Sequence, residues 1–200
     1  MKTGGSVPAA RTASITGLIL AGGQGLRMGG LDKGWIEFRG RPLVQHVLER
    51  FAPQVDSMLI SANRNIDRYR TLGVEVLTDD TDRFGEFQGP LAGIVQAMRA
   101  AGPGLLAVVP CDAPALPGNL VNRLADALGD ASAAVAWCGG QVQPVFCLLN
   151  TDLRARLEEA LNDALRKPAD FLQSVGAVAV PFESEREFAN LNTHADLAEF

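Results

Sequence analysis

The chain has 200 residues, 47% of them hydrophobic and 20% charged, which fits one ordinary domain with a hydrophobic core of its own. Its formal net charge at pH 7 is −5, and no stripe of lysines and arginines alternates with aromatic residues, so we expect no binding to nucleic-acid polymers. The longest apolar runs have the length of strands and fall short of the roughly 20 residues of a bilayer span, so we expect no membrane association.

The N-terminal segment differs in composition from the rest of the chain. Residues 1–14 are rich in Gly, Ser, Ala and Thr, which predicts a flexible tail. No apolar stretch of about 7 to 15 residues follows Lys2 or Arg11, so this segment does not resemble a signal peptide. We therefore expect a soluble, cytoplasmic protein with a single domain over residues 15–200.

The first predicted element is a buried strand at residues 15–20, which are mostly aliphatic or β-branched. It runs into a glycine-rich loop. After a short extended piece at residues 35–38, a helix is expected to begin near Pro42. Its apolar residues follow at helical spacing and are Leu43, Val44, Val47, Leu48 and Phe51. This spacing predicts a helix that packs on the core.

Strands and helices alternate over the rest of the chain. Further strands are predicted at residues 55–61, 74–77, 105–109, 133–138, 142–149 and 178–181. Further helices are predicted at residues 91–101, from beyond 117 to about 128, from 151 to about 165, and after 193. Parallel neighbours need crossover connections, which are usually helical. The alternation therefore predicts an α/β fold, a Rossmann-like three-layer sandwich with a mostly parallel sheet.

Two distant segments are expected to meet at one end of this sheet. In doubly wound sheets the first and fourth strands commonly lie side by side where the strand order reverses, and ligands bind beyond their carboxyl ends. This rule places the loop after Leu20 beside Asp112, which follows the predicted strand at residues 105–109. A carboxylate there could hold a hard cation such as Mg²⁺. A helix N-cap or a turn would also suit an aspartate at this position.

The loop after the first strand combines glycines with cations. The glycines are Gly22, Gly23, Gly25, Gly29 and Gly30. Backbone N–H groups without a neighbouring Cβ can face phosphate oxygens, although a glycine cluster is also typical of a plain mobile connection. Arg27 and Lys33 favour the phosphate site, because two cations would neutralise a triphosphate. The spacing fits neither a Walker loop nor GxGxxG, and Asn63 stands where a dinucleotide-binding fold has an acidic residue.

The glycine loop carries three short motifs, Leu-Ala-Gly-Gly from Leu20, Arg-Met-Gly-Gly from Arg27 and Asp-Lys-Gly from Asp32. Later motifs follow at residues 42–43, 46–47, 61–64, 89–93, 110–114 and 190–193. In this order the motifs resemble those of the molybdenum cofactor guanylyltransferases. Sugar-phosphate nucleotidyltransferases share the first motif, and the later ones narrow the resemblance, which covers nearly all of residues 15–197. It implies a nucleotidyltransferase domain with a fold like that of the nucleotide-diphospho-sugar transferases.

The resemblance implies transfer of GMP from GTP to the terminal phosphate of molybdopterin, with release of pyrophosphate. The GTP-binding residues that it implies are Leu20, Ala21, Gly22, Gly23, Lys33, Asn63, Asp79 and Asp112. We expect Arg27, Lys33 and Asp112 to be catalytic and Asp112 to bind Mg²⁺. Asp79 could accept hydrogen bonds from guanine N1–H and N2–H₂, although Asp80 could take its place.

The implied partners are GTP and molybdopterin as substrates, with transient contacts to molybdenum cofactor insertion proteins or acceptor molybdoenzymes. Three alternatives stay open: a cytidylyltransferase, a sugar-phosphate nucleotidyltransferase, and a nucleotide sensor without catalysis. Other chemistry has little support, because His46 and His194 lie far apart in the sequence and fit structural roles. The cysteines form no CxxC pair, which favours buried reduced thiols, and they are Cys111, Cys138 and Cys147.

Overall fold

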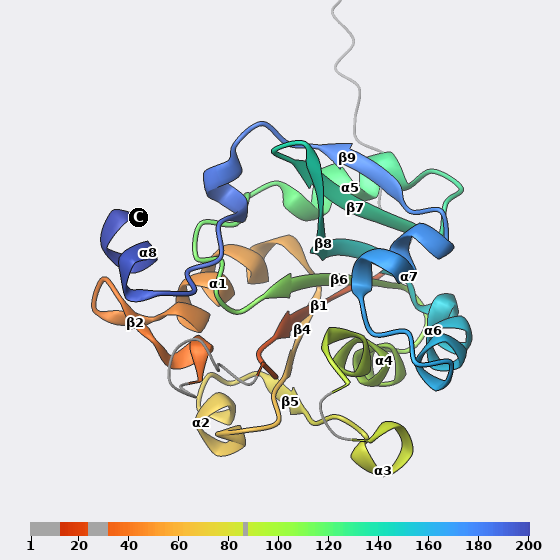
Figure 1. Ribbon diagram of the computed structural model, residues 1–200, viewed down its shortest axis with the longest axis horizontal. Helices are drawn as coiled ribbons and strands as arrows, with labels where there is room; N and C mark the ends of the chain where they lie inside the picture. Colours follow the sequence, from red (N-terminus) through yellow and green to blue (C-terminus); the bar gives the residue numbers. More distant parts are fainter. Residues whose placement is uncertain (1–12, 24–31, 86–87) are drawn as a thin grey trace, which may run out of the picture.

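The computed structural model of the chain (Figure 1) describes residues 13–23, 32–85 and 88–200. The predicted tail at residues 1–14 lies outside the described residues except for its last two positions. Part of the glycine loop, residues 24–31, lies outside them as well.

Seven strands of the described chain form the main sheet, in the order β5-β4-β1-β6-β8-β7-β9. Their bounds are β1 Ile15–Leu20, β4 Ser57–Ser61, β5 Glu75–Leu77, β6 Leu105–Pro110, β7 Ala133–Cys138, β8 Gln141–Asn150 and β9 Val178–Pro181. The strand β8 runs antiparallel to both of its neighbours, and the other pairs of neighbours are parallel. The prediction of a mostly parallel sheet is therefore confirmed. A small separate ladder pairs β2, Glu37–Phe38, with β3, Arg41–Pro42.

A tight turn explains the direction of β8. Gly139 and Gly140 connect β7 to β8 and have φ values of 59° and 78°. Two successive residues with positive φ are typical of the hairpin turns that join antiparallel strands, and glycine adopts this conformation without steric cost. The turn therefore reverses the chain within two residues, whereas a parallel neighbour would need a crossover.

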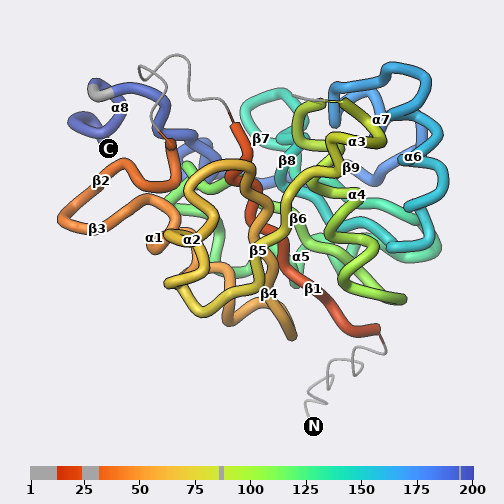
Figure 2. The backbone as a smooth tube through the Cα atoms, turned by 90° about the horizontal axis from the view of Figure 1, so that it is seen from below, coloured from red at the N-terminus to blue at the C-terminus, as the bar shows by residue number. Residues whose placement is uncertain are grey.

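Helices cover both faces of the sheet. Their bounds are α1 Leu43–Phe51, α2 Ile66–Arg70, α3 Thr81–Phe84, α4 Pro90–Ala101, α5 Leu120–Leu128, α6 Arg154–Asn162, α7 Pro168–Ser174 and α8 His194–Glu199. One buried cluster packs α1 and α5 against the sheet, and a second packs α4, α6 and α7 against the opposite face. Figure 2 shows α4, α6 and α7 gathered on one side of the molecule, with α1 and α2 on the other. The three-layer α/β prediction is thus confirmed.

Some predicted boundaries were wrong. The helix expected at residues 151–165 is split into a 3-10 turn, Thr151–Leu153, and α6, which ends at Asn162. Ala164 has a φ of 63°, so the helix cannot continue through it. The extended piece expected at residues 35–38 is partly a 3-10 helix, Lys33–Trp35. The short helices α2, α3 and α7 were not predicted.

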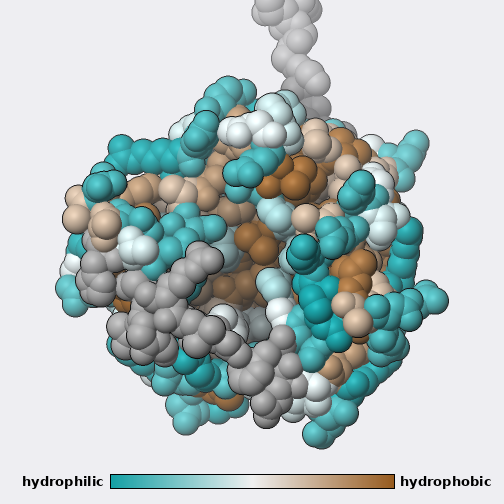
Figure 3. Space-filling view, in the orientation of Figure 1, coloured by the Kyte–Doolittle hydropathy of each residue, from teal (hydrophilic) through white to brown (hydrophobic). Residues whose placement is uncertain are grey.

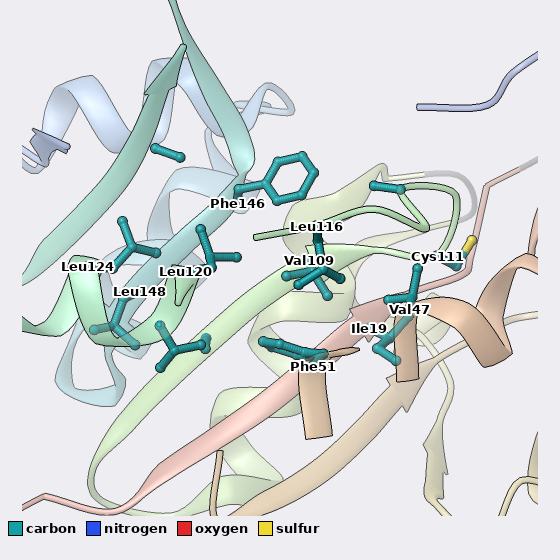
Figure 4. Packing of buried hydrophobic residues seen from close by; sticks show 14 of the residues in the cluster. Ile19, Val47, Phe51, Val109, Cys111, Leu116, Leu120, Leu124, Phe146 and Leu148 are labelled. Carbon is teal, nitrogen blue, oxygen red and sulfur yellow. The ribbon is translucent and has the colours of Figure 1, made fainter. Parts of the chain in front are cut away.

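The core positions the ends of the central strands. Val47 and Phe51 of α1 lie over Ile19 of β1 and Val109 of β6, as Figure 4 shows. Burial of each such side chain contributes about 1.5 to 3 kcal/mol to the free energy of unfolding. The helix can approach β1 this closely because Gly17 has no Cβ. A Cβ at this position would lie only 2.8 Å from Phe51 Cε1. Parallel pairing of β1 with β6 up to Leu20 and Pro110 holds the carboxyl ends of the two strands side by side.

Two further expectations concern the state of the cysteines and whether any helix could span a membrane. Cys111, Cys138 and Cys147 are free and buried, as predicted, and burial raises the pKa of Cys147 to about 12. None of the helices in the described parts of the chain has the length and apolar character needed to cross a membrane.

Candidate active site

A cavity of about 1040 Å³ lies at the carboxyl ends of the central strands. There β1 pairs in parallel with β4 on one side and β6 on the other, and the strand order reverses between β1 and β6. The predicted proximity of the first and fourth main strands is confirmed. Figure 3 shows a hollow near the centre of this face, with apolar residues at its floor and hydrophilic residues above it and to its right. Clefts at such reversal points are the usual ligand sites of doubly wound sheets.

The residues that the sequence predicts to bind GTP meet in the wall of this cavity. Those that line it are Leu20, Ala21, Gly22, Gly23, Lys33, Asn63, Asp79 and Asp112. Arg27, the remaining predicted catalytic residue, lies outside the described residues. The structure thus brings the described candidates together, while their roles toward a ligand stay predictions.

Lys33 and Asp112 form an ion pair in the wall of the cavity. Lys33 Nζ lies 3.3 Å from Asp112 Oδ2 and also donates a hydrogen bond to Asn192 Oδ1. Asp112 directly follows Cys111 at the end of β6 and is only 7% exposed. Burial raises the pKa of Asp112, and the Lys33 ammonium offsets part of that rise. A half-buried cation and a buried carboxylate are therefore held together in the cavity wall.

Asn192 reaches Lys33 because the segment before α8 folds back onto the site. Leu191 is buried with Phe38 and Leu43, and its backbone N–H donates to the Asp112 carbonyl at 2.9 Å. Figure 1 shows α8 beside the β2 and β3 ladder. Burial of Leu191 leaves Asn192 in the cavity wall. Residues 190–193 were recognised in the sequence only as a motif shared with the family, and no role was predicted for Asn192.

Asn63 and Asp79 form a second polar pair in the cavity wall. Asn63 Nδ2 donates to Asp79 Oδ2 at 2.7 Å, and the Asp79 backbone N–H donates to Asn63 Oδ1 at 2.9 Å. Asp79 Oδ1 is buried and accepts no hydrogen bond from the described residues. Burial raises the pKa of Asp79, and the hydrogen bond from Asn63 lowers it in part. A buried acceptor without a donor favours a ligand that supplies one.

Asp80, the alternative to Asp79, is committed elsewhere. Asp80 Oδ1 accepts from the backbone N–H of Arg83 at 3.3 Å and caps α3. Asp80 Oδ2 accepts from Arg99 Nη1 at 3.2 Å. The geometry therefore favours Asp79 as the carboxylate that faces the cavity.

The glycine loop lies close against the end of β4. The backbone N–H of Ala21 donates to the Ser61 carbonyl at 2.8 Å, and Arg64 Nη2 donates to the Gly23 carbonyl at 2.9 Å. A Cβ at Gly22 would lie 3.2 Å from the Asn63 amide nitrogen, so glycine allows this approach. Arg64 also lines the cavity. It was not predicted as a site residue, although it directly follows Asn63 in the motif at residues 61–64.

His46 has a structural place, as expected. Its Nε2 lies 2.8 Å from the Phe38 carbonyl oxygen, and its ring meets the edge of the Phe38 ring at 5.4 Å between centroids. It is not among the described residues that line the cavity. The described segments also hold no group of three or more His, Cys, Asp or Glu side chains that could bind a metal ion by themselves.

Comparison with known proteins finds a matching family model and relatives with similar sequences. The family model for the MobA-like NTP transferase domain matches residues 17–178. A molybdenum cofactor guanylyltransferase from Burkholderia orbicola is 45% identical over 203 residues, covering 96% of this chain and 98% of that protein. One from Serratia proteamaculans is 44% identical, with 91% of each chain covered.

Solved structures agree on the fold. Molybdopterin-guanine dinucleotide biosynthesis protein A from Archaeoglobus fulgidus has a TM-score of 0.71 at 22% identity, over 92% of this chain and 95% of that chain. A 4-diphosphocytidyl-2C-methyl-D-erythritol synthase from Anaerococcus prevotii has a TM-score of 0.70 at 14% identity, over 94% and 96%. At these identities the likeness concerns the fold alone.

Proposed function

This chain belongs to the molybdenum cofactor guanylyltransferase family, and on that premise we propose that it transfers GMP from GTP to the terminal phosphate of molybdopterin, with or without bound molybdenum. The products are molybdopterin guanine dinucleotide and pyrophosphate. One observation supports this proposal most strongly. A single cavity at the carboxyl ends of β1 and β6 collects the described residues for which we predict contacts with GTP.

The proposed reaction is a direct transfer at the α-phosphorus of GTP. An oxygen of the terminal phosphate of molybdopterin forms a P–O bond to the α-phosphorus, while the bond from the α-phosphorus to the bridging oxygen of the β-phosphate breaks. The electron pair of the broken bond leaves with pyrophosphate, so no covalent enzyme intermediate is needed. The contribution of the chain is then positioning and electrostatic stabilisation.

Lys33 and Arg27 are the cations that we assign to the leaving pyrophosphate. The Lys33 ammonium lies in the cavity wall, where the Asp112 carboxylate and the Asn192 amide oxygen hold it. An ammonium held in advance needs little reorganisation as negative charge develops on the leaving group. The role of Arg27 is proposed from its place in the glycine loop of the sequence.

Mg²⁺ is the proposed metal ion, with Asp112 as its protein ligand. A single carboxylate fits this ion, because Mg²⁺ keeps several waters and is usually bound by one or two carboxylates together with substrate phosphates. Asp112 offers such a carboxylate in the same wall as Lys33 and the glycine loop. Bound there, Mg²⁺ would offset negative charge on the phosphates.

Asn63 and Asp79 are proposed to hold the nucleoside. Asn63 fixes the Asp79 carboxylate through one oxygen and leaves Oδ1 as a buried acceptor. The N1–H and N2–H₂ groups of guanine are donors on one edge of the base, and a carboxylate can accept from both. The pairing edge of cytosine has the N3 and O2 acceptors and a single donor group, N4–H₂, so a carboxylate accepts from fewer donors there and this pair favours GTP.

A pyrophosphate-release assay with each of the four NTPs and Mg²⁺, with molybdopterin supplied or withheld, tests the proposal. We expect release only with GTP and molybdopterin together. Release with CTP would favour a cytidylyltransferase, and tight GTP binding without release under any condition would indicate a nucleotide-binding module. Either result would contradict the guanylyltransferase.

We also propose that residues 15–200 form the nucleotidyltransferase domain and that the protein acts in the cytoplasm. Its substrates would be GTP and molybdopterin. Because the dinucleotide product must reach an apoenzyme, we propose transient contacts with molybdenum cofactor insertion proteins or acceptor molybdoenzymes.

A further inference from the structure

A buried tyrosine lies behind the cavity wall, next to the turn that carries Lys33. We propose that Tyr69 is a positioning residue, which fixes this turn by a hydrogen bond to Asp32 and so places the Lys33 ammonium in the cavity. The inference rests on the proposed function, in which Lys33 acts on the leaving pyrophosphate. It adds a residue with no direct part in binding the substrates.

The Asp32 carboxylate is the centre of the contacts that fix the turn. Its Oδ1 accepts from the Tyr69 hydroxyl at 2.5 Å and from the backbone N–H of Gly34 at 3.3 Å. Its Oδ2 accepts from Asn65 Nδ2 at 2.9 Å. Asp32 is thus the N-cap of the 3-10 helix Lys33–Trp35, and the lysine is the first residue inside the turn.

Tyr69 itself is held firmly by its surroundings. It is fully buried on α2, and its ring centroid lies 5.2 Å from that of Trp35. The Arg68 guanidinium lies over the Trp35 ring at 4.0 Å. A Cβ at Gly34 would overlap the Tyr69 hydroxyl, so glycine is what lets the turn come this close. Burial raises the pKa of Tyr69, and the hydroxyl therefore keeps the proton that it donates.

The link from Tyr69 to the chemistry runs through Lys33. Tyr69 is not among the described residues that line the cavity. The Tyr69 and Asp32 pair fixes the backbone end of the lysine, and Asp112 and Asn192 hold its ammonium end. Both ends must be fixed, because the aliphatic chain between them has several rotatable bonds. Loss of either anchor would let the ammonium move from its place.

Tyr69→Phe is the sharpest variant, because it removes only the hydroxyl and keeps the buried ring. We expect kcat to fall about tenfold or more, since a misplacement of about 1 Å can cost on the order of 10²-fold. The KM for GTP should rise by less than kcat falls, because Asn63 and Asp79 keep their places in the cavity wall while Lys33 is displaced. A fall in kcat that exceeds the rise in KM is typical of an interaction that matters more in the transition state than in binding of the substrate.

A double-mutant cycle separates positioning of Lys33 from general damage to the fold. In a Lys33→Ala background, Tyr69→Phe should lower kcat no further, because no ammonium remains to be positioned. Additive effects of the two changes would overturn the inference. So would a wild-type kcat in the Tyr69→Phe variant.

Thr151→Val is a matched control for loss of a buried hydroxyl. Thr151 is 7% exposed, and its hydroxyl pairs with the backbone of Gly104, ahead of the amino end of β6 and away from the cavity. It should lower the unfolding temperature and keep kcat at temperatures well below unfolding. An equal loss of kcat in this control would show that Tyr69→Phe acts through stability alone.

Two further measurements keep the outcome decisive. Asp32→Ala removes the acceptor of the Tyr69 hydroxyl and leaves the buried tyrosine ring in place, so it should also lower kcat. If Tyr69→Phe does not fold, Asp32→Ala replaces it in the double-mutant cycle with Lys33→Ala. Amide hydrogen exchange at Gly34 and Trp35 should speed up in Tyr69→Phe, and unchanged exchange would overturn the inference whatever the activity. The two proposals can fail separately. If the wild-type protein releases no pyrophosphate but exchange at Gly34 and Trp35 is faster in Tyr69→Phe, the proposed function fails while the role of Tyr69 in fixing the turn stands.

Discussion

Lys33 is the residue on which the candidate chemistry depends most. Its ammonium is held 3.3 Å from Asp112 Oδ2 in the cavity wall. Lys33→Ala should lower the rate of pyrophosphate release by about 10²-fold or more, because one preorganised electrostatic partner is lost. Lys167→Ala is the matched control, since Lys167 is an exposed lysine at the N-cap of α7. A near wild-type rate in the Lys33 variant, with the control also unchanged, would reject the role.

Asp112 carries the prediction about the metal ion. Asp112→Asn keeps the size of the side chain and an acceptor for Lys33, but removes the charge. The gain in GTP affinity that Mg²⁺ provides should shrink by at least about tenfold, since even groups that only hydrogen-bond to the ligands of a metal typically contribute that much. Isothermal titration with and without Mg²⁺ measures it. Asp126→Asn, at an exposed aspartate of α5, serves as control, and an unchanged metal dependence in Asp112→Asn would remove the assignment.

Site residues that directly follow a strand could be predicted from the sequence, whereas those that a loop or a short helix brings to the site could not. Gly22 and Asp112 follow buried strands, and one topological rule brings those ends together. Asn192 meets Lys33 across 159 positions of sequence, and Tyr69 meets Asp32 from a short helix. Neither contact leaves a periodic signal, so their roles required the three-dimensional arrangement.

Among the elements, α3, α4 and α6 are tied together by Glu158. Glu158 on α6 accepts from Arg99 of α4 at 2.9 Å and from Arg83 of α3 at 2.8 Å. Burial alone would raise the pKa of Glu158, but the hydrogen bonds from these arginines outweigh it and lower the pKa. A carboxylate with a depressed pKa stabilises the fold above its unfolded-state pKa, and this contribution is lost as the pH falls through the folded-state value.

Glu158→Gln should therefore cost stability at neutral pH and little in acid. The loss in free energy of unfolding should be about 1 kcal/mol or less near pH 7, because the side chain is partly exposed. The difference from wild type should shrink as the pH falls below about 4.5, the ordinary pKa of a glutamate. Urea unfolding across this pH range tests it, with the exposed Glu159→Gln as control. A difference independent of pH would contradict the ion-pair origin.

The long elements were predictable because their apolar patterns repeat. The strands Ala133–Cys138 and Val178–Pro181 match their predictions at both ends. In contrast, α2 and α7 have five and seven residues, which is too short for a helical spacing to recur. The residue ahead of α2, Asn65, has a left-handed φ of 51°, which no apolar pattern reveals. The missed α2 is also the helix that carries Tyr69.

For the whole molecule, binding of GTP should stabilise the fold. The cavity wall includes residues from Leu20 to Asn192, so global unfolding destroys the site. Saturation at about 100 times Kd adds about 2.7 kcal/mol to the free energy of unfolding. For a domain of this size that is a rise in Tm of about 5 to 10 °C. Thermal unfolding with Mg²⁺ and GTP measures it, and an equal rise with CTP would contradict the selectivity for guanine.

The contact between Lys33 and Asn192 also has a consequence during synthesis of the protein. The two residues are separated by 159 positions, so at about 5 to 20 residues per second a ribosome adds the asparagine roughly 8 to 30 seconds after the lysine. Until then the ammonium of the nascent chain lacks one of its anchors, even where β1 has already paired with β4. A growing chain can therefore build most of its sheet before it can complete the wall of its substrate cavity.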